Sequence, residues 1–374
     1  MPPSTSVTAD SRLSLYFRSL GIVASLYLFI VAIGAMAASF NLFGREFAAA
    51  VLETTSDPVL GLLIGVLATS LVQSSSTSTS IIVGMVAGGV ISVEGAVPMI
   101  MGANIGTTVT SMLVSLGHLR RPAELQRGFA AATLHCAFNV LGVLILLPLE
   151  LLTGFVSGAA VFLSGVFQDI GGMRLANPMK AATAPAIELL AWLCGHQPVV
   201  LLLVAVTLTY GALVTIVKLL RSMMLKRLED IFDRHIFRTP LRALLFGLLI
   251  TFAVQSSSIP TALAIPLAAA GIIKLRQIYP FSLGANLGTT LTAMLAALAT
   301  ANPAAITVAF AHLLFNLIGV LVIWPIRILR EIPLRIAGFM GEVAFRRPVV
   351  PALCVALLYF VIPAIALVAV HFAG

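Results

Sequence analysis

The chain has 374 residues, of which 60% are hydrophobic and only 10% are charged, with a mean hydropathy of +1.09. Soluble domains carry about 25% charged residues, so this chain has too little polar surface to fold in water and needs lipid around several spans. The net charge of +8 does not indicate nucleic-acid binding, because the basic residues stand in short clusters between apolar runs. Composition therefore predicts an all-α polytopic membrane protein and excludes a soluble domain.

The N-terminal segment, residues 1–19, is expected to be cytoplasmic, and the first apolar run follows it at 20–43. This run contains Ala35-Met36-Ala37, a small-residue pattern typical of signal-peptide cleavage sites, so a secretory signal is the alternative interpretation. The run is longer than a typical signal sequence, and the internal repeat described below requires it as a membrane span.

Further apolar segments predict crossings at 96–116, 129–152, 198–217, 278–299, 305–326 and 350–372. Two other apolar stretches, 61–91 and 243–273, are too long for one straight span. Each would make a helix of about 46 Å, whereas the hydrocarbon core is about 30 Å thick. Polar residues lie near the middle of each stretch, which favours two half-helices folded as a re-entrant hairpin.

Two connecting segments complete the predicted organisation. Segment 153–197, with an apolar stretch near 156–167, is expected to be a periplasmic connector that carries a surface helix. Segment 327–349 is rich in arginine and is expected to lie in the cytoplasm, before the final transmembrane helix within 350–374.

Blocks of the sequence recur 182 residues apart. Gln73-Ser74-Ser75-Ser76 returns at 255–258, and the block that begins at Gly102 and ends at Thr108 returns at 284–290. A third pair, His135 with Asn139, returns at a slightly shorter distance as His312 with Asn316. Three ordered blocks are too many for chance. We therefore predict a duplication, with repeat 1 at 20–152 and repeat 2 at 198–326.

The basic clusters predict how the two repeats are oriented. With the N-terminus in the cytoplasm, loops 117–128, 218–242 and 327–347 fall inside, and the uncharged loop 300–304 falls outside. Three crossings then separate the two hairpins, so the first hairpin enters from outside and the second from inside. This is an inverted-topology repeat, which is common among secondary transporters, and it places the C-terminus in the periplasm.

The hydroxyl run Ser74–Ser80, directly after Gln73, is the strongest functional signal. A single serine would be explained by helix packing or by bonding back to the helix. Seven consecutive hydroxyl residues beside an amide, with a second Gln-Ser-Ser-Ser copy, favour a polar cavity instead. The N-termini of half-helices carry partial positive charge that suits an anion, and Pro260 fits the first turn of such a helix.

The repeated Gly-Ala-Asn-Ile/Leu-Gly-Thr-Thr blocks offer amide and hydroxyl oxygens and flexible backbone carbonyls, which suit Na⁺. Their glycines also match small-residue packing sites between helices. The His/Asn pairs lie one helical turn apart, and either a binding role or a purely structural tie between helices explains them. Acidic residues are nearly absent from the spans, which disfavours a proton relay. No Walker, transition-metal or organic-cofactor motif occurs, so Na⁺ is the expected coupling ion.

Taken together, these motifs resemble the signature pairs of the type II sodium-dependent phosphate cotransporters, over about residues 15–374. The resemblance implies a bacterial inner-membrane member of that family, not an enzyme. It would couple Na⁺ entry to uptake of inorganic phosphate, mainly HPO₄²⁻, by alternating access, and a homodimer is the assembly implied. The implied phosphate ligands are Gln73, Ser74, Ser75, Ser76, Ser256, Ser257 and Ser258. The implied sodium ligands are Gln255, Ser256, Asn286, Thr289 and Thr292, and the first block adds Asn104, Thr107 and Thr108 as candidates.

One position departs from the family's pattern. Electrogenic members carry Asp directly after the first His of the His/Asn pair, and this chain has Cys136 there. A thiol is a poor ligand for Na⁺, so we expect electroneutral transport with two Na⁺ per HPO₄²⁻. Two alternatives remain open. One is Na⁺-coupled transport of another oxyanion, such as sulfate or a dicarboxylate, although no span core supplies the Arg fork that carboxylates usually attract. The other is a membrane channel or sensor.

Overall fold

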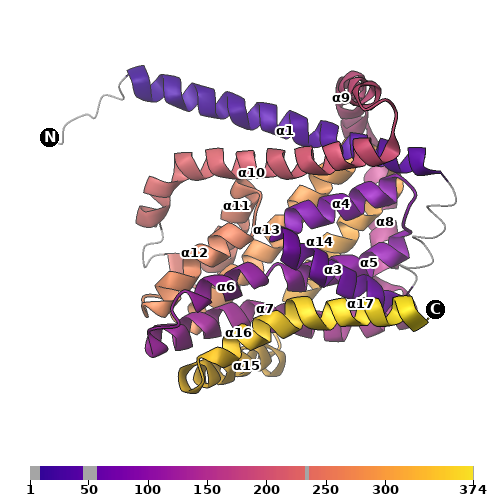
Figure 1. Cartoon of the computed structure of the whole chain (residues 1–374). Helices are drawn as coiled ribbons and strands as arrows, with labels where there is room; N and C mark the ends of the chain where they lie inside the picture. The colour runs from indigo at the N-terminus through magenta and orange to yellow at the C-terminus, as the bar shows by residue number, and fades with distance from the viewer. Residues whose placement is uncertain (1–8, 45–56, 232–235, 374) are drawn as a thin grey trace.

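The computed structural model describes residues 9–44, 57–231 and 236–373. Residues 1–8 of the predicted cytoplasmic N-terminus, and 232–235 of the predicted basic loop 218–242, lie outside the described residues. Within the described ranges all of the regular secondary structure is helical, and there is no β-strand (Figure 1). The fold class predicted from composition, an all-α polytopic membrane protein, is confirmed.

Among the described residues, seven helical segments are long and apolar enough to cross a membrane, and they match the seven predicted crossings. The helices that form them are α1 (Ala9–Phe43), α5 with α6 (Val93–Gly106 and Val109–Leu116), α7 (Pro122–Thr153), α10 (Pro198–Ile231), α13 (Leu275–Thr300), α14 (Pro303–Ile323), and α16 (Val349–Ala356) continued by the π-helical turn η2 (Leu357–Val361) and α17 (Ile362–Ala373). In Figure 1, α1 and α10 run side by side along one flank of the bundle, and α16 with α17 runs along the opposite flank.

Each of the two stretches predicted to be hairpins is a pair of short helices. The first pair is α3 (Pro58–Val72) and α4 (Ser75–Ala87), and the second is α11 (Pro240–Val254) and α12 (Ser258–Ala269). Both pairs begin three residues earlier than predicted. The reason is local: Asp57 and Thr239 cap the first helices, and Pro58 and Pro240 follow at the first helical position, which tolerates proline.

Both first helices end on a glutamine in the left-handed backbone region. Gln73 and Gln255 each have a φ of 55°, a conformation that non-glycine residues rarely adopt. The chain therefore turns at the same motif position in both copies. Residues with such uncommon backbone geometry cluster at functional sites. The two Gln-Ser-Ser-Ser breaks are therefore candidates for a functional site.

The two copies also pack in the same way. Helix α3 lies against α5, and α11 lies against α13, with glycines where the backbones touch. A Cβ atom on any of these glycines would run into a backbone carbonyl of the facing helix. The contacts are Gly65 against Met99, Gly102 against Leu62, Gly247 against Phe281 and Gly284 against Leu244. The second two contacts are the first two shifted by 182 residues. The repeated glycines therefore serve close helix packing.

The Gly-Ala-Asn blocks differ between the copies. Helix α5 ends at Gly106 and α6 begins at Val109, so the first block is interrupted at Thr107 and Thr108. Helix α13 runs unbroken through the second block. The helix is thus interrupted in the first block only. In repeat 1 the interruption places the Thr108 hydroxyl 2.5 Å from the Tyr359 hydroxyl of η2.

The connector 153–197 holds two helices rather than the one expected. Helix α8 (Phe155–Asp169) packs against α14, and α9 (Met173–Leu193) packs against α1. Neither is among the helices long and apolar enough to cross a membrane in the described chain. Their location in the periplasm stays a prediction.

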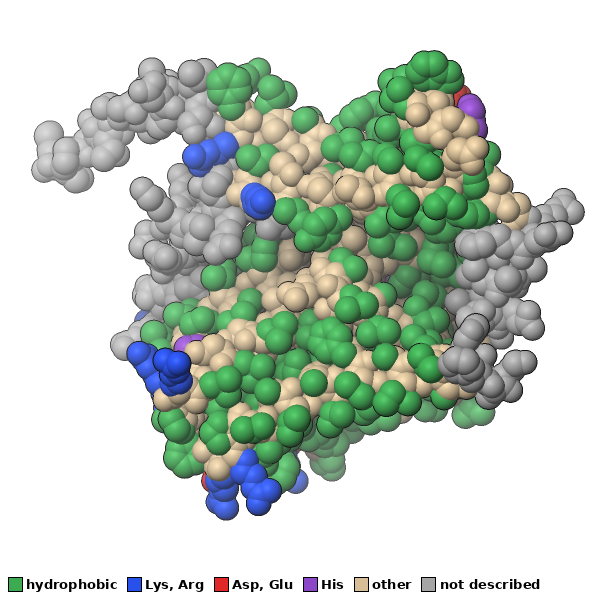
Figure 2. Space-filling view, in the orientation of Figure 1, with side chains coloured by type: hydrophobic (Ala, Val, Ile, Leu, Met, Phe, Trp, Pro, Cys, Tyr) green, Lys and Arg blue, Asp and Glu red, His purple; other side chains and the backbone are tan. Residues whose placement is uncertain are grey.

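The segment predicted to be cytoplasmic, 327–349, contains the amphipathic helix α15 (Arg327–Arg346), which packs along α7. Arg276 at the start of α13 donates two hydrogen bonds, of 2.7 and 2.8 Å, to the Glu331 carboxylate of α15. This guanidinium holds the pKa of the Glu331 carboxyl below its usual range. In Figure 2 the visible Lys and Arg side chains gather toward one end of the molecule, and hydrophobic side chains cover the middle.

Candidate functional site

The breaks of the two hairpins meet inside the bundle. The Ser76 hydroxyl of α4 donates a hydrogen bond of 3.0 Å to the backbone carbonyl of Gln255. The side-chain carbonyl of Gln255 accepts a bond of 2.9 Å from the Thr292 hydroxyl of α13, and its amide nitrogen donates to the carbonyl of Phe252 at 2.7 Å. Gln255 therefore joins both hairpins and α13 at one point.

A cavity of about 560 Å³ lies at this junction. Five of the residues predicted to bind phosphate or sodium line it: Gln73, Ser74, Gln255, Ser256 and Ser258. The rest of its wall comes from Val72 of α3, from Thr77 of α4, from α6 and α10, and from apolar residues of α12. Segments 182 residues apart in the sequence thus contribute to one cavity.

Three other predicted phosphate ligands, Ser75, Ser76 and Ser257, are buried at the starts of α4 and α12 and are not part of the cavity wall. The two helix starts differ. Ser74 caps α4 by accepting hydrogen bonds from the Thr77 backbone N–H and hydroxyl. Ser257 makes no side-chain cap for α12, so the N–H groups in the first turn of α12 lack this partner. Both helix N-termini lie beside the cavity.

The predicted sodium ligands Asn104 and Asn286 lie instead in a buried network that ties four helices together. Asn286 pairs with His135 through its carbonyl oxygen and donates to Asn139, both at 2.6 Å. Asn139 donates to the backbone carbonyl of Asn104, and Asn316 donates to the Asn104 side chain. Neither Asn104 nor Asn286 lines the cavity. His135, Asn139 and Asn316 thus join α5, α7, α13 and α14, whereas the ring nitrogens of His312 have no hydrogen-bond partner among the described residues.

The predicted threonine ligands fall into two groups. Thr107, Thr108 and Thr289 are buried and bond to carbonyls of their own helical turns. This is the common way for a threonine to satisfy its hydroxyl within a helix. Thr292 differs because its hydroxyl reaches the Gln255 side chain at the cavity. Of this set, Thr292 is the residue that the fold brings to the hairpin junction.

Sequence reasoning missed three residues of the cavity wall, Thr110, Tyr210 and Lys218, whereas a fourth, Thr77, belongs to the predicted hydroxyl run. Thr110 is the repeat 1 counterpart of Thr292, and its buried hydroxyl has no hydrogen-bond partner. Applying the 182-residue shift to Thr292 would have found it. Tyr210 and Lys218 belong to α10, outside the repeated motifs, and no local pattern marks them.

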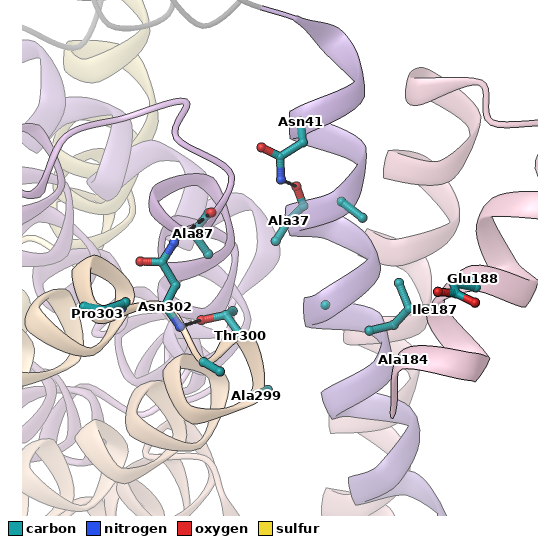
Figure 3. Close-up of a pocket in the computed structure, with 13 residues that line it drawn as sticks. Ala37, Asn41, Ala87, Ala184, Ile187, Glu188, Ala299, Thr300, Asn302 and Pro303 are labelled. Atoms are coloured by element: carbon teal, nitrogen blue, oxygen red, sulfur yellow. Dashed lines mark hydrogen bonds between the residues drawn. The ribbon is translucent and has the colours of Figure 1, made fainter. Parts of the chain in front are cut away.

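A second cavity, of about 410 Å³, lies between α1, α9 and the α13–α14 junction. Figure 3 shows Asn302 directed at Ala87, to whose carbonyl it donates at 3.1 Å, while Asn41 bonds to Ala37 of its own helix. None of the predicted site residues lines this space. A third cavity, of about 460 Å³, is almost wholly apolar and includes Cys136 and Tyr359. The hairpin cavity is therefore the candidate site.

Fold and site together define a helical, multi-pass membrane protein with a cavity to which two broken helix pairs contribute polar groups. The chain belongs to the Na⁺/Pi-cotransporter family, which matches residues 28–174 and 208–338. It is 32% identical to sodium-dependent phosphate transport protein 2A of Ovis aries, and the aligned region covers 85% of this chain and 62% of that protein. It is 30% identical to protein 2B of Homo sapiens, over 93% of this chain and 65% of that one. The chain thus spans about three fifths of the length of these relatives. No solved structure matches it.

Proposed function

We propose that this protein is a secondary active symporter that couples Na⁺ entry to the uptake of inorganic phosphate. The observation that carries the proposal is the single cavity lined by both Gln-Ser-Ser-Ser breaks. Family membership supports it, since the similar proteins 2A and 2B are named sodium-dependent phosphate transport proteins. The protein would act without chemistry on its substrate and without an organic cofactor, with Na⁺ as the coupling ion.

The phosphate site in this proposal consists of Gln73, Ser74, Ser75, Ser76, Ser256, Ser257 and Ser258. The hydroxyls supply donors to the anion, and the starts of α4 and α12 add backbone N–H groups and the positive ends of two helix dipoles. No acidic side chain is among the described residues that line the cavity, so nothing in its wall repels an anion.

The sodium sites in this proposal use Gln255, Ser256 and Thr292 at the junction, together with Asn286 and Thr289 of α13 and Asn104, Thr107 and Thr108 of repeat 1. The strongest support is at Gln255, whose side-chain oxygen lies 2.9 Å from the Thr292 hydroxyl. Two oxygen ligands of the kind that a small hard cation prefers are thereby adjacent to the phosphate cavity. Each cation placed there would also offset the charge of the bound anion.

The proposal includes a location: the bacterial inner membrane, with two inverted repeats, a cytoplasmic N-terminus, a periplasmic C-terminus and a homodimeric assembly. The proposed orientation in the membrane rests on the basic loops, because Lys and Arg are enriched in cytoplasmic loops. Single cysteines placed in 117–128 and in 218–242 are expected to react with an impermeant maleimide only after the cytoplasmic face is opened. A cysteine in 300–304 should react in intact cells. Labelling of the two basic loops from opposite faces would contradict the inverted repeat.

Uptake by purified protein tests the proposed function directly. Proteoliposomes should accumulate ³²P-phosphate under an inward Na⁺ gradient, and replacing Na⁺ with K⁺ should abolish the accumulation. Unlabelled sulfate and succinate serve as competitors for the alternative of another oxyanion. Uptake that is independent of Na⁺, or inhibited by sulfate better than by phosphate, would refute the proposal.

Ser75→Ala and Ser257→Ala are expected to weaken phosphate binding. Each change removes one donor to the anion, and one charge-assisted hydrogen bond contributes roughly 1.5–3 kcal/mol, or about tenfold or more in affinity. The half-saturating phosphate concentration should rise accordingly at saturating Na⁺. Thr153→Ala is the control, because its exposed hydroxyl bonds only to a carbonyl of its own helix. Parental phosphate affinity in both serine variants would rule these two residues out as ligands.

Transport is expected to be electroneutral, with two Na⁺ per HPO₄²⁻. The thiol of Cys136 occupies the position where electrogenic relatives are expected to carry a carboxylate, and it lies beside an apolar cavity. A third Na⁺ there would be an unpaired charge within the membrane, which is costly. Phosphate should therefore evoke no current from proteoliposomes on a solid-supported membrane. A current that scales with phosphate flux would overturn this stoichiometry and leave the phosphate assignment intact.

A further inference from the structure

The hairpin cavity is bounded on one side by α10, which contributes Tyr210, Val214 and Lys218 to its wall. Lys218 is the only charged side chain among the described residues that line the cavity. Tyr210 is 49% exposed, and Lys218 is also exposed, so the cavity is open to the surface at this wall. Beyond Lys218, α10 continues toward the basic segment that precedes α11.

The other end of the hairpin junction is closed by packed apolar side chains. Beyond the hydroxyl run of α4, Ile82, Val83 and Val86 are buried in the same hydrophobic cluster as Met36 of α1 and the alanines Ala293 and Ala296 of α13. The cavity between α1 and α9 lies in that direction and shares no lining residue with the hairpin cavity. The hairpin cavity therefore borders exposed residues of α10 on one side and a buried apolar cluster on the other.

We propose that the structure is the conformation open to the cytoplasm, and that Lys218 is a phosphate-positioning residue at the mouth of the release cavity. The inference rests on the proposed function. It adds Lys218 as a residue that acts on phosphate, and the cytoplasm as the side to which the cavity opens. A phosphate dianion that leaves the Gln-Ser-Ser-Ser breaks passes through a cavity whose other polar lining groups are neutral. Lys218 carries a compact ammonium charge on a flexible side chain. This charge attracts the phosphate anion both when it leaves the cavity and when it enters from the cytoplasm.

A purely topological role for Lys218 predicts a different behaviour. Basic residues at the cytoplasmic ends of spans orient the protein in the membrane without touching the substrate. Lys274, an exposed lysine before α13, is such a residue and does not line the cavity. Removing one charge from each position therefore separates the two roles. Only the loss of Lys218 should change how the protein handles phosphate on the cytoplasmic face.

The test is ³²P-phosphate exchange measured in inside-out and right-side-out membrane vesicles that contain the full chain. Lys218→Gln is expected to raise the half-saturating phosphate concentration about threefold to tenfold on the cytoplasmic face, and to leave it unchanged on the periplasmic face. Lys218→Glu should raise it further, Lys218→Arg should retain the parental value, and Lys274→Gln should have no effect. The difference should shrink in high salt, because the charge is exposed.

Chemical rescue supplies a second measurement that does not depend on comparing expression levels. In a chain with Cys136, Cys194 and Cys354 replaced by alanine, Lys218→Cys should regain cytoplasmic phosphate affinity after an aminoethyl thiosulfonate restores a cation. A sulfonatoethyl thiosulfonate of similar size should weaken the affinity further. Equal effects of the two reagents, unchanged affinity in Lys218→Gln, or an equal shift in Lys274→Gln would overturn the role of Lys218. If the parent exchanges no phosphate, the proposed function fails, and this inference falls with it.

Discussion

Gly284→Ala is expected to destabilise the protein severely, by about 3 kcal/mol, although it adds a single methyl group. The new Cβ would run into the backbone carbonyl of Leu244, in the tight contact between α11 and α13. A backbone atom cannot rotate away as a side chain does, so one helix must shift. Overpacking of this kind costs about 1–3 kcal/mol, and more where backbone is displaced. The apparent melting temperature in detergent should fall by roughly 4 °C.

Gly211→Ala is the matched control, because it makes the same change in a helix interior where nothing lies within 4 Å of the added Cβ. Since alanine favours helix over glycine, this variant should melt at or slightly above the parental temperature. Gly102→Ala, the repeat 1 counterpart that faces Leu62, should behave like Gly284→Ala. Parental melting temperatures for both Gly102→Ala and Gly284→Ala would show that the two helix contacts are looser than the structure indicates.

Removing the Gln255 side chain is expected to raise the Na⁺ concentration needed for half-maximal uptake by about tenfold or more. Its amide oxygen accepts from Thr292, and its backbone carbonyl accepts from Ser76, so it links the sodium and phosphate parts of the proposed site. Gln255 also has a φ of 55°, which alanine tolerates poorly. Gln255→Gly therefore separates the two effects, because glycine accepts this backbone and lacks the side chain.

Thr292→Val should reproduce the sodium defect of Gln255→Gly, and Thr215→Val is its control. The hydroxyl of Thr215 is exposed and bonds only to the carbonyl of Gly211 in its own helix. Sodium activation of uptake at saturating phosphate is the measurement. If only Gln255→Ala is impaired and Gln255→Gly is normal, the residue contributes backbone geometry and not a ligand. Parental sodium curves for Gln255→Gly and Thr292→Val together would remove both residues from the sodium site.

The sequence alone determined the helices and the positions where they break. Hydropathy marks each crossing because about 20 apolar residues are needed to span lipid, and these signals are local. The breaks at Gln73 and Gln255 could be located because a polar motif interrupts an apolar stretch that is too long for one span. The repeat was equally visible, since related segments retain the same residues at the same spacing. The boundaries at Pro58 and Pro240 were missed by three residues, although proline and its capping neighbour mark them.

Only the tertiary structure decided which polar groups meet. It brought Gln255 to Ser76 and Thr292, and it placed Asn286 in a buried network with His135 rather than in the cavity wall. The spacing of residues in the sequence cannot predict these contacts, because hydrogen-bond partners more than a hundred residues apart depend on how whole helices pack. Lys218 is the clearest case. As a sequence position it is one basic residue among several in a charged loop, and it becomes a candidate for binding phosphate because α10 folds against both hairpins.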